Sequence, residues 1–82
     1  MSLKLKIVSP ERIEFEGEVK RVVVPGMLGQ FEILVNHAPI ISSLVKGRVE
    51  YLQTGGEQST LDIIGGFVEV QKNVVSLCVE MQ

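Results

Sequence analysis

Apolar and polar residues alternate with a period of two along almost the whole chain. The first segment, LKLKIV, places Leu3, Leu5 and Ile7 on one side and Lys4 and Lys6 on the other. This alternation is typical of a β-strand with one buried and one solvated face. The same pattern recurs and predicts nine strands of ordinary length, over residues 3–8, 12–18, 19–24, 30–35, 40–45, 48–53, 59–64, 67–71 and 74–80.

Turn-forming residues separate the predicted strands. No segment shows the apolar stripe that is typical of an amphipathic helix. The turn signals are Ser9-Pro10, Pro25-Gly26, Gly55-Gly56 and Lys72-Asn73. Gly55-Gly56 is expected to form a two-residue hairpin, because glycine tolerates the positive φ that such a turn requires. Short strands at this spacing predict one all-β domain over residues 1–82, a small flattened antiparallel β-sandwich or barrel. The expected core includes Leu3, Leu5, Ile7, Phe15, Phe31, Ile33, Leu61, Ile63 and Val70.

The pair Gly65-Gly66 differs from the other glycine sites because apolar strand residues flank it on both sides. Paired glycines inside a strand pattern indicate a bulge or a sharp bend, where another backbone approaches closely. The pair lacks the surrounding pattern of a phosphate-binding loop, so we expect no nucleotide there.

Composition and charge exclude several classes of function. The net charge is −2 and the basic residues are spread along the chain, so the electrostatic footprint of a nucleic-acid-binding protein is missing. One cysteine and one histidine cannot form an internal disulfide or supply the ligands of a zinc site. No apolar run approaches the ~20 residues that cross a bilayer. We therefore expect no metal, no cofactor and no direct membrane insertion.

The single histidine, His37, lies at a proline-bearing corner between two apolar runs. General-base catalysis requires a nucleophile and usually an orienting carboxylate. The only aspartate, Asp62, is distant in sequence, and no G-x-S-x-G motif is present. Local hydrogen bonding or contact with a partner is the favoured role, and no catalytic residue is predicted.

Cys78 alternates out of phase with Val75, Leu77 and Val79, so it should face the opposite side of its strand beside Ser76. An activated thiol needs a cationic neighbour or a helix N-terminus. The local sequence offers neither, and a structural or incidental role is expected.

The segment PGMLGQ, residues 25–30, carries Met27 and Leu28 where a turn is ordinarily polar. Two interpretations are open. The two side chains can fold back over the core, or they can form an exposed contact surface, for which methionine is well suited.

The order of these features resembles the epsilon-chain family of the rotary F-type ATP synthase. The resemblance covers nearly the whole chain and includes VPGMLGQFEILVNHAPIISSLVKGRVEY and IIGGFVEVQKNVVSLCVE. Its most specific parts are the corner His37-Ala38-Pro39, the turn Lys46-Gly47 and residues 65–70. The opening KIVSPE, which contains Ser9, also resembles the usual start of the family.

The resemblance implies a sandwich of about ten strands and a non-catalytic rotor subunit of the central stalk. Such a subunit joins the gamma chain to the ring of c subunits and supports the coupling of proton flow to ATP synthesis. It is a peripheral protein at the cytoplasmic face of the bacterial plasma membrane. The positions that match the gamma-chain contact are Ser9, His37 and Ser42. Those that match the c-ring contact loop are Pro25, Gly26, Met27, Leu28, Gly29 and Gln30.

Three positions depart from the family pattern. Asn36 replaces a common glycine, but asparagine also tolerates a left-handed conformation, so the turn should survive. Gln30 replaces a common acidic residue, which removes a charge-assisted contact with a basic c-ring loop, and Glu32 replaces a small residue.

Many relatives continue into two C-terminal helices that can inhibit ATP hydrolysis. Because the sequence stops at Gln82, we expect the 82-residue chain to inhibit little and to bind no nucleotide.

A second class of function, a small β-sandwich module that binds another protein or a ligand, remains an alternative. A ligand-binding module usually offers aromatic platforms in a concave surface. Aromatic residues make up only 5% of the chain and tryptophan is absent. These counts favour protein contacts over a small-molecule site.

Overall fold

The computed structural model describes residues 2–81, which form seven β-strands. Their bounds are β1 (Leu3–Val8), β2 (Ile13–Gly26), β3 (Gly29–Ile33), β4 (Ile40–Leu44), β5 (Gly47–Gln53), β6 (Gln58–Gln71) and β7 (Val74–Met81). The all-β prediction is confirmed. The count is seven, rather than nine or about ten, because four of the predicted segments are joined in pairs within the long strands β2 and β6.

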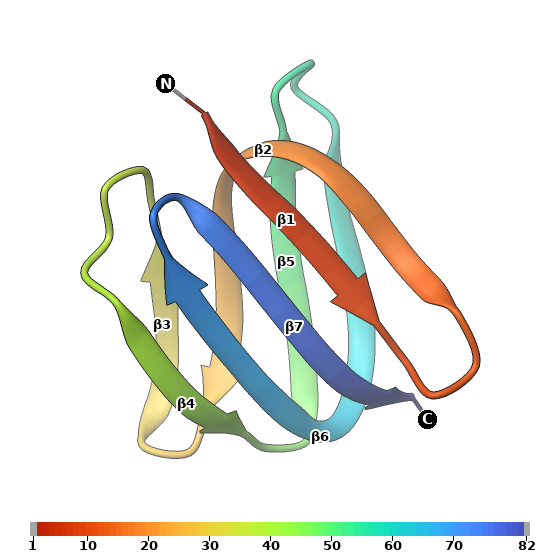
Figure 1. Ribbon diagram of the computed structural model, residues 1–82. Coiled ribbons are helices and arrows are strands. Elements are labelled where there is room, and N and C mark those ends of the chain that lie inside the picture. Colours follow the sequence, from red (N-terminus) through yellow and green to blue (C-terminus); the bar gives the residue numbers. More distant parts are fainter. Residues whose placement is uncertain (1, 82) are drawn as a thin grey trace.

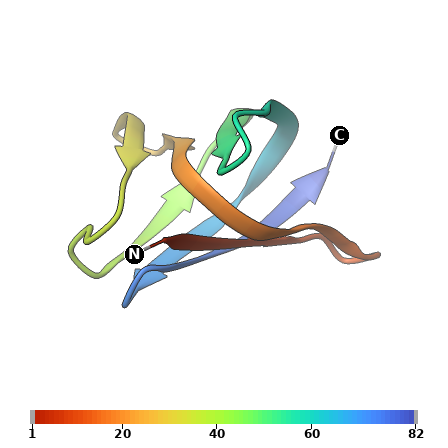
Figure 2. The same ribbon diagram turned by 90° about the horizontal axis from the view of Figure 1, so that it is seen from above.

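The strands form one hydrogen-bonded sheet that folds into two packed layers (Figures 1 and 2). Layer 1 contains β4, the second part of β6 (residues 63–71), β7, β1 and the first part of β2 (residues 13–19). Layer 2 contains β3, the second part of β2 (residues 19–26), β5 and the first part of β6 (residues 58–63). All pairings are antiparallel except that of β1 with β7, which is parallel. The antiparallel prediction therefore fails at this one pairing, where the first strand inserts between β7 and β2.

Each long strand passes from one layer to the other at an irregularity in its ladder. The register of β2 shifts between Val19 and Arg21, and that of β6 shifts between Ile63 and Gly65. Gly66 has a φ of 145°, and a Cβ there would overlap the carbonyl oxygen of Cys78 on the neighbouring strand β7. The predicted bend and close backbone approach at the glycine pair are confirmed, since only glycine fits this geometry.

The core lies between the two layers and consists of apolar side chains. Six predicted members are fully buried, and the other three, Phe15, Phe31 and Leu61, are partly buried and packed against them. The rings of Phe15 in layer 1 and Tyr51 in layer 2 have centroids 4.5 Å apart and join the layers. Each fully buried aliphatic side chain stabilises the fold by about 1.5–3 kcal/mol.

Two predicted turns have different outcomes. Lys72 and Asn73 form a two-residue connection with φ values of 51° and 62°, the signature of a type I′ hairpin. Gly55-Gly56 was expected to form a two-residue hairpin, and this is wrong, because residues 54–57 all lie between β5 and β6. The longer loop closes through hydrogen bonds from Gln53 N to Glu57 O and from Gly56 N to Gln53 O, both of 2.8 Å.

Two strand edges are left open on the same side of the sandwich. Within residues 2–81, β3 pairs only with β2, whereas β4 pairs along its length with β6 and meets β2 at a single position, Gly26 opposite Leu44. The opening is a groove of about 440 Å³, lined by Gly26, Met27, Leu28, Gly29, Phe31, Ile40, Ile41, Ser42 and Ser43. It lies beside the loop at residues 25–30, which the sequence singled out as a contact segment.

Candidate functional site

The hairpin at residues 25–30 has a fixed base and an exposed apolar tip. At the base, Met27 N donates to Ser43 O (3.1 Å) and Val45 N donates to Pro25 O (2.9 Å), which tie the hairpin to β4 and the residue after it. At the tip, Met27 is 65% exposed and Leu28 is fully exposed. Neither side chain folds back over the core, so the inward interpretation of this segment is wrong, and a contact role for the exposed tip stays a prediction.

The His37 corner lies in the loop at residues 34–39, between β3 and β4. Asn36 adopts a φ of 66°, so the left-handed turn is retained without glycine, as predicted. His37 N donates to Leu34 O at 3.2 Å, and His37 Nδ1 lies 2.8 Å from Ala38 O. Because a carbonyl oxygen can only accept, Nδ1 carries the proton, and Nε2 remains available on the half-buried ring.

Within residues 2–81, the ring of His37 has no hydrogen bond to a carboxylate. The hydrogen bonds of His37 stay within its own corner. The only aspartate, Asp62, lies on β6 in layer 2 and pairs with Arg48 (Nε to Oδ1, 3.2 Å). His37 and Asp62 thus have their hydrogen-bond partners in different parts of the sandwich.

Ser9 belongs to a compact polar cluster at the turn between β1 and β2. Its hydroxyl lies 2.9 Å from Glu14 Oε2, and Arg12 Nε donates to the same carboxylate oxygen at 3.2 Å. These hydrogen bonds, from Arg12 first and then from Ser9, hold the pKa of Glu14 below its ordinary value, and Glu14 in turn raises the pKa of Arg12. The Glu14 side chain is only 8% exposed. The Ser9 hydroxyl is thus used within the molecule, and its neighbour Ile13 is the more exposed group, at 53%.

Ser42 lies on the inner side of β4, in phase with Ile40 and Leu44. It remains half-exposed beside the open edge, and its hydroxyl donates to Ser43 O at 3.2 Å. The outward-facing residues of this strand are Ile41 and Ser43. Any contact made by Ser42 is therefore at the groove and not on the outer face of layer 1.

The structure does not gather the three candidate serine and histidine residues into one patch. Strands β4, β7 and β1 run in the same direction within layer 1, because β4 and β7 are both antiparallel to β6 and β1 is parallel to β7. Ser9 follows the end of β1 and His37 precedes the start of β4, so they lie at opposite ends of the layer (Figure 1). The hairpin at residues 25–30 lies at the same end as Ser9.

An exposed apolar row crosses the outer face of layer 1 at that same end. The register places Phe67 opposite Cys78, Cys78 opposite Val8, and Val8 opposite Ile13. Phe67 is 49% exposed, and Val8 and Cys78 are half-buried, with Cys78 facing away from the core as predicted. We call Phe67, Cys78, Val8 and Ile13 the apolar row. At its β4 end the row meets Ser43, whose carbonyl oxygen accepts a hydrogen bond from Met27 N of the hairpin.

Sequence reasoning missed this row. Each member is one outward-facing residue in a different strand, and alternation alone marks such positions as solvent-facing. The available signal was an apolar residue at an outward position, as with Phe67 between Gly66 and Val68. Only the strand register shows that several of these residues are neighbours.

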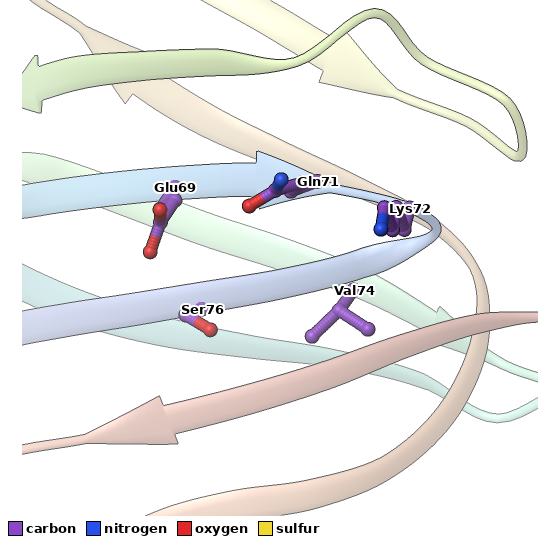
Figure 3. Close-up of a pocket in the computed structure, with 5 residues that line it drawn as sticks. All are labelled: Glu69, Gln71, Lys72, Val74 and Ser76. Carbon is purple, nitrogen blue, oxygen red and sulfur yellow. The ribbon is translucent and has the colours of Figure 1, made fainter.

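The other end of layer 1 carries a shallow polar hollow of about 330 Å³ on the outer side of the β6–β7 hairpin (Figure 3). Figure 3 shows Glu69 and Gln71 on β6, Lys72 at the turn, and Val74 and Ser76 on β7. The hollow offers one carboxylate, one ammonium, one amide and one hydroxyl group, which suits polar surface contacts.

Among residues 2–81, no cluster of three or more His, Cys, Asp or Glu side chains could hold a metal ion. The same residues include no helix long and apolar enough to cross a membrane.

Fold and surface together define a class: a small all-β sandwich that exposes apolar side chains at a hairpin tip and in the apolar row. The model of the ATP synthase delta/epsilon chain β-sandwich domain matches residues 2–81. The chain belongs to this family, and the resemblance noted from its sequence is confirmed.

Two proteins named as ATP synthase epsilon chains are similar in sequence to this chain over nearly its whole length. The ATP synthase epsilon chain of Leptospira interrogans (serovar copenhageni) is 43% identical over 75 residues, which cover 92% of this chain and 58% of that protein. The epsilon chain of Chlorobaculum tepidum is 38% identical over 76 residues, which cover 93% of this chain and 86% of that one. The chain thus spans little more than half the length of the first of these relatives.

Two solved structures show the same fold. A chain of the Euglena gracilis mitochondrial ATP synthase (OSCP/F1/c-ring) has a TM-score of 0.89 at 21% identity, with 95% of this chain and 50% of that chain covered. A chain of the Tetrahymena thermophila mitochondrial ATP synthase (central stalk/c-ring) has a TM-score of 0.82 at 13% identity, with 98% and 64% covered. At these identities the likeness concerns the architecture of the sandwich.

Proposed function

We propose that this chain is a non-catalytic rotor subunit of the central stalk of a proton-translocating F-type ATP synthase. It joins the gamma chain to the c ring and supports the coupling of proton flow to ATP synthesis, without catalytic residues of its own. It is peripheral, at the cytoplasmic face of the bacterial plasma membrane. The family membership and the names of the similar proteins support this role.

The observation that carries the proposal is the exposed apolar pair Met27 and Leu28 on an anchored hairpin. A monomeric domain gains nothing from displaying a fully exposed leucine at a turn, whereas a subunit contact removes it from water. We assign the hairpin at residues 25–30 to the c ring. With Gln30 uncharged, this contact depends on apolar burial and backbone hydrogen bonds more than on ion pairing.

The gamma chain is assigned to layer 1, between Ser9 and His37, with Ser42 at the open edge. The apolar row gives this surface a buried centre of the kind that protein interfaces use, with polar groups around it. His37 contributes its available Nε2 at one margin of the surface. Torque transmission requires a joint with two separate contacts: the hairpin tip supplies the contact with the c ring, and the outer face of layer 1 supplies the contact with the gamma chain.

The test is reconstitution of the chain with the gamma chain and the c ring. We expect the wild-type chain to be retained by the gamma chain in a pull-down and to increase retention of the c ring. Met27→Ser with Leu28→Ser should leave the unfolding temperature unchanged and weaken c-ring retention at least about tenfold, because two exposed anchors are removed. Val23→Ser, at a half-buried, outward-facing valine on the layer 2 part of β2, is the matched control and should retain the c ring. Failure of the wild-type chain to bind the gamma chain would reject the proposal.

A further inference from the structure

The corner that carries His37 is held by a residue distant in sequence. Asn36 N donates to Asn73 Oδ1 at 2.6 Å, and Asn73 Nδ2 donates to Asn36 Oδ1 at 3.2 Å. These two hydrogen bonds link the loop at residues 34–39 to the β6–β7 hairpin, across 37 positions of sequence. The remaining hydrogen bonds of the corner, from His37 to Leu34 and Ala38, shape it internally but do not attach it to the sandwich.

Asn73 is itself fixed from two other directions. Its φ of 62° places it in the type I′ turn that follows Lys72, and its carbonyl oxygen accepts Lys4 N from β1 at 2.9 Å. The turn lies at the end of the hairpin shown in Figure 3, between Lys72 and Val74. The backbone of Asn73 therefore has a defined position, and its side-chain amide transmits that position to the corner.

We infer that Asn73 is a positioning residue for the His37 corner: its side-chain amide sets where the corner stands relative to layer 1. The amide is suited to this role because one group supplies both an acceptor for the Asn36 N–H and a donor for the Asn36 side chain. An untethered corner would have to be ordered when a partner binds, and that ordering lowers affinity. The consequence for binding rests on the proposed function, whereas the positioning itself is a property of the isolated domain.

Asn73→Gly separates this role from a general structural one. Glycine is favoured at the second position of a type I′ turn, so the hairpin and its hydrogen bond to Lys4 should persist while the side-chain amide is lost. NMR of the 82-residue chain then compares the solvent exchange rates of two backbone amides. We expect exchange at Asn36 to rise about tenfold, the factor that corresponds to ~1.4 kcal/mol. Exchange at Lys4 should change by less than about twofold.

Two further variants serve as matched controls. Lys72→Gly alters the neighbouring turn position, which also has a positive φ (51°), and should leave exchange at both amides unchanged. Asn73→Asp keeps an oxygen that accepts the Asn36 N–H, so Asn36 should stay protected at neutral pH. If exchange at Asn36 in Asn73→Gly equals that of the wild type, Asn73 does not position the corner. If Asn36 and Lys4 lose protection together, the residue is merely structural and the inference is overturned.

The second arm measures affinity for the gamma chain with the same variants. With wild-type binding established, we expect Asn73→Gly to weaken it about fivefold and Lys72→Gly to leave it unchanged. A loosened corner with unchanged affinity would overturn the role of this positioning in binding. If the wild-type chain does not bind the gamma chain, the proposed function fails, and the exchange rates still decide whether Asn73 positions the corner.

Discussion

The two outer faces of the sandwich differ, although both belong to the same continuous sheet. Both outer faces carry charged residues, but two of the three ion pairs among residues 2–81 lie on layer 2, Arg21 with Glu32 and Arg48 with Asp62. The third, Arg12 with Glu14, lies at the margin of layer 1, whose outer face is crossed by the apolar row.

This difference shows that the fold and the interaction surface are encoded by different residues of the same strands. The inner positions of both layers are mostly apolar and form one core, with Ser42 at the open edge as a polar exception. The outer positions are free of that requirement, so layer 2 pairs its charges in water and layer 1 exposes Phe67 and Ile13. On the proposed function, we therefore expect the gamma chain to bind on the side of layer 1.

The largest expected effect comes from Gly66, where β6 enters layer 1. Gly66→Ala places a Cβ against the Cys78 carbonyl and within 2.9 Å of the Val79 Cα, at a φ of 145°. Because both neighbours are backbone atoms that cannot move aside, we expect the free energy of unfolding to fall by about 2–4 kcal/mol. Denaturant titration measures this change. Gly55→Ala, where nothing lies within 4 Å, is the control and should stay within about 0.5 kcal/mol. Similar losses in the two variants would contradict the close approach.

The next effect concerns the apolar row and is an effect on binding. Phe67→Ser with Ile13→Ser removes its two most exposed members, at 49% and 53%. We expect gamma-chain affinity to fall at least about tenfold, with the free energy of unfolding changed by less than about 1 kcal/mol. The matched control is Val23→Ser, at a half-buried valine on the layer 2 part of β2 that faces away from the buried Val22 and Val24. Calorimetric titration that shows equal losses in both variants would remove the distinction between the faces.

A smaller effect, dependent on pH, is expected at the Ser9 cluster. The pKa of Glu14 is lowered in the folded state by the hydrogen bonds from Arg12 and Ser9. Its contribution to stability is therefore present above the ordinary glutamate value of 4.5 and is lost as the pH falls through the lowered pKa. The wild type should melt above Glu14→Gln at pH 7, and the two melting temperatures should converge in acid. Arg12→Ala should make this loss smaller and end it at a higher pH, because the pKa of Glu14 in the folded state is then lowered less. Melting curves that stay parallel from neutral to acid pH would show that the cluster does not have this role.

The smallest effect is expected on layer 2. The Arg48–Asp62 pair is 60% and 62% exposed, and exposed pairs of this kind contribute little because water screens them. Asp62→Asn should change the free energy of unfolding by no more than about 0.5 kcal/mol and leave gamma-chain affinity unaltered. A larger loss on binding would place a partner on the outer face of layer 2 as well.

Much of the fold could be predicted because burial imposes a period of two on every strand. The segments 12–18 and 19–24 were correctly placed as strands, but alternation cannot show that they continue into each other as β2 through a bulge. The Gly55-Gly56 turn failed for a related reason, since glycine permits several loop lengths and only the partner strand selects one. The exposed tip at Met27 and Leu28 was one of two interpretations, and a sequence pattern does not reveal whether a turn folds inward.

The sequence by itself determined the strand segments, the inner and outer sides of each and the need for glycine at the bend in β6, because these follow from local backbone geometry and from apolar burial. The tertiary structure alone decided the parallel insertion of β1 beside β7, the alignment of the apolar row and the link from Asn36 to Asn73. These features join residues that are far apart in the chain, and their positions depend on strand order and register. Register is set by the packing of whole layers, which no local stretch of sequence specifies.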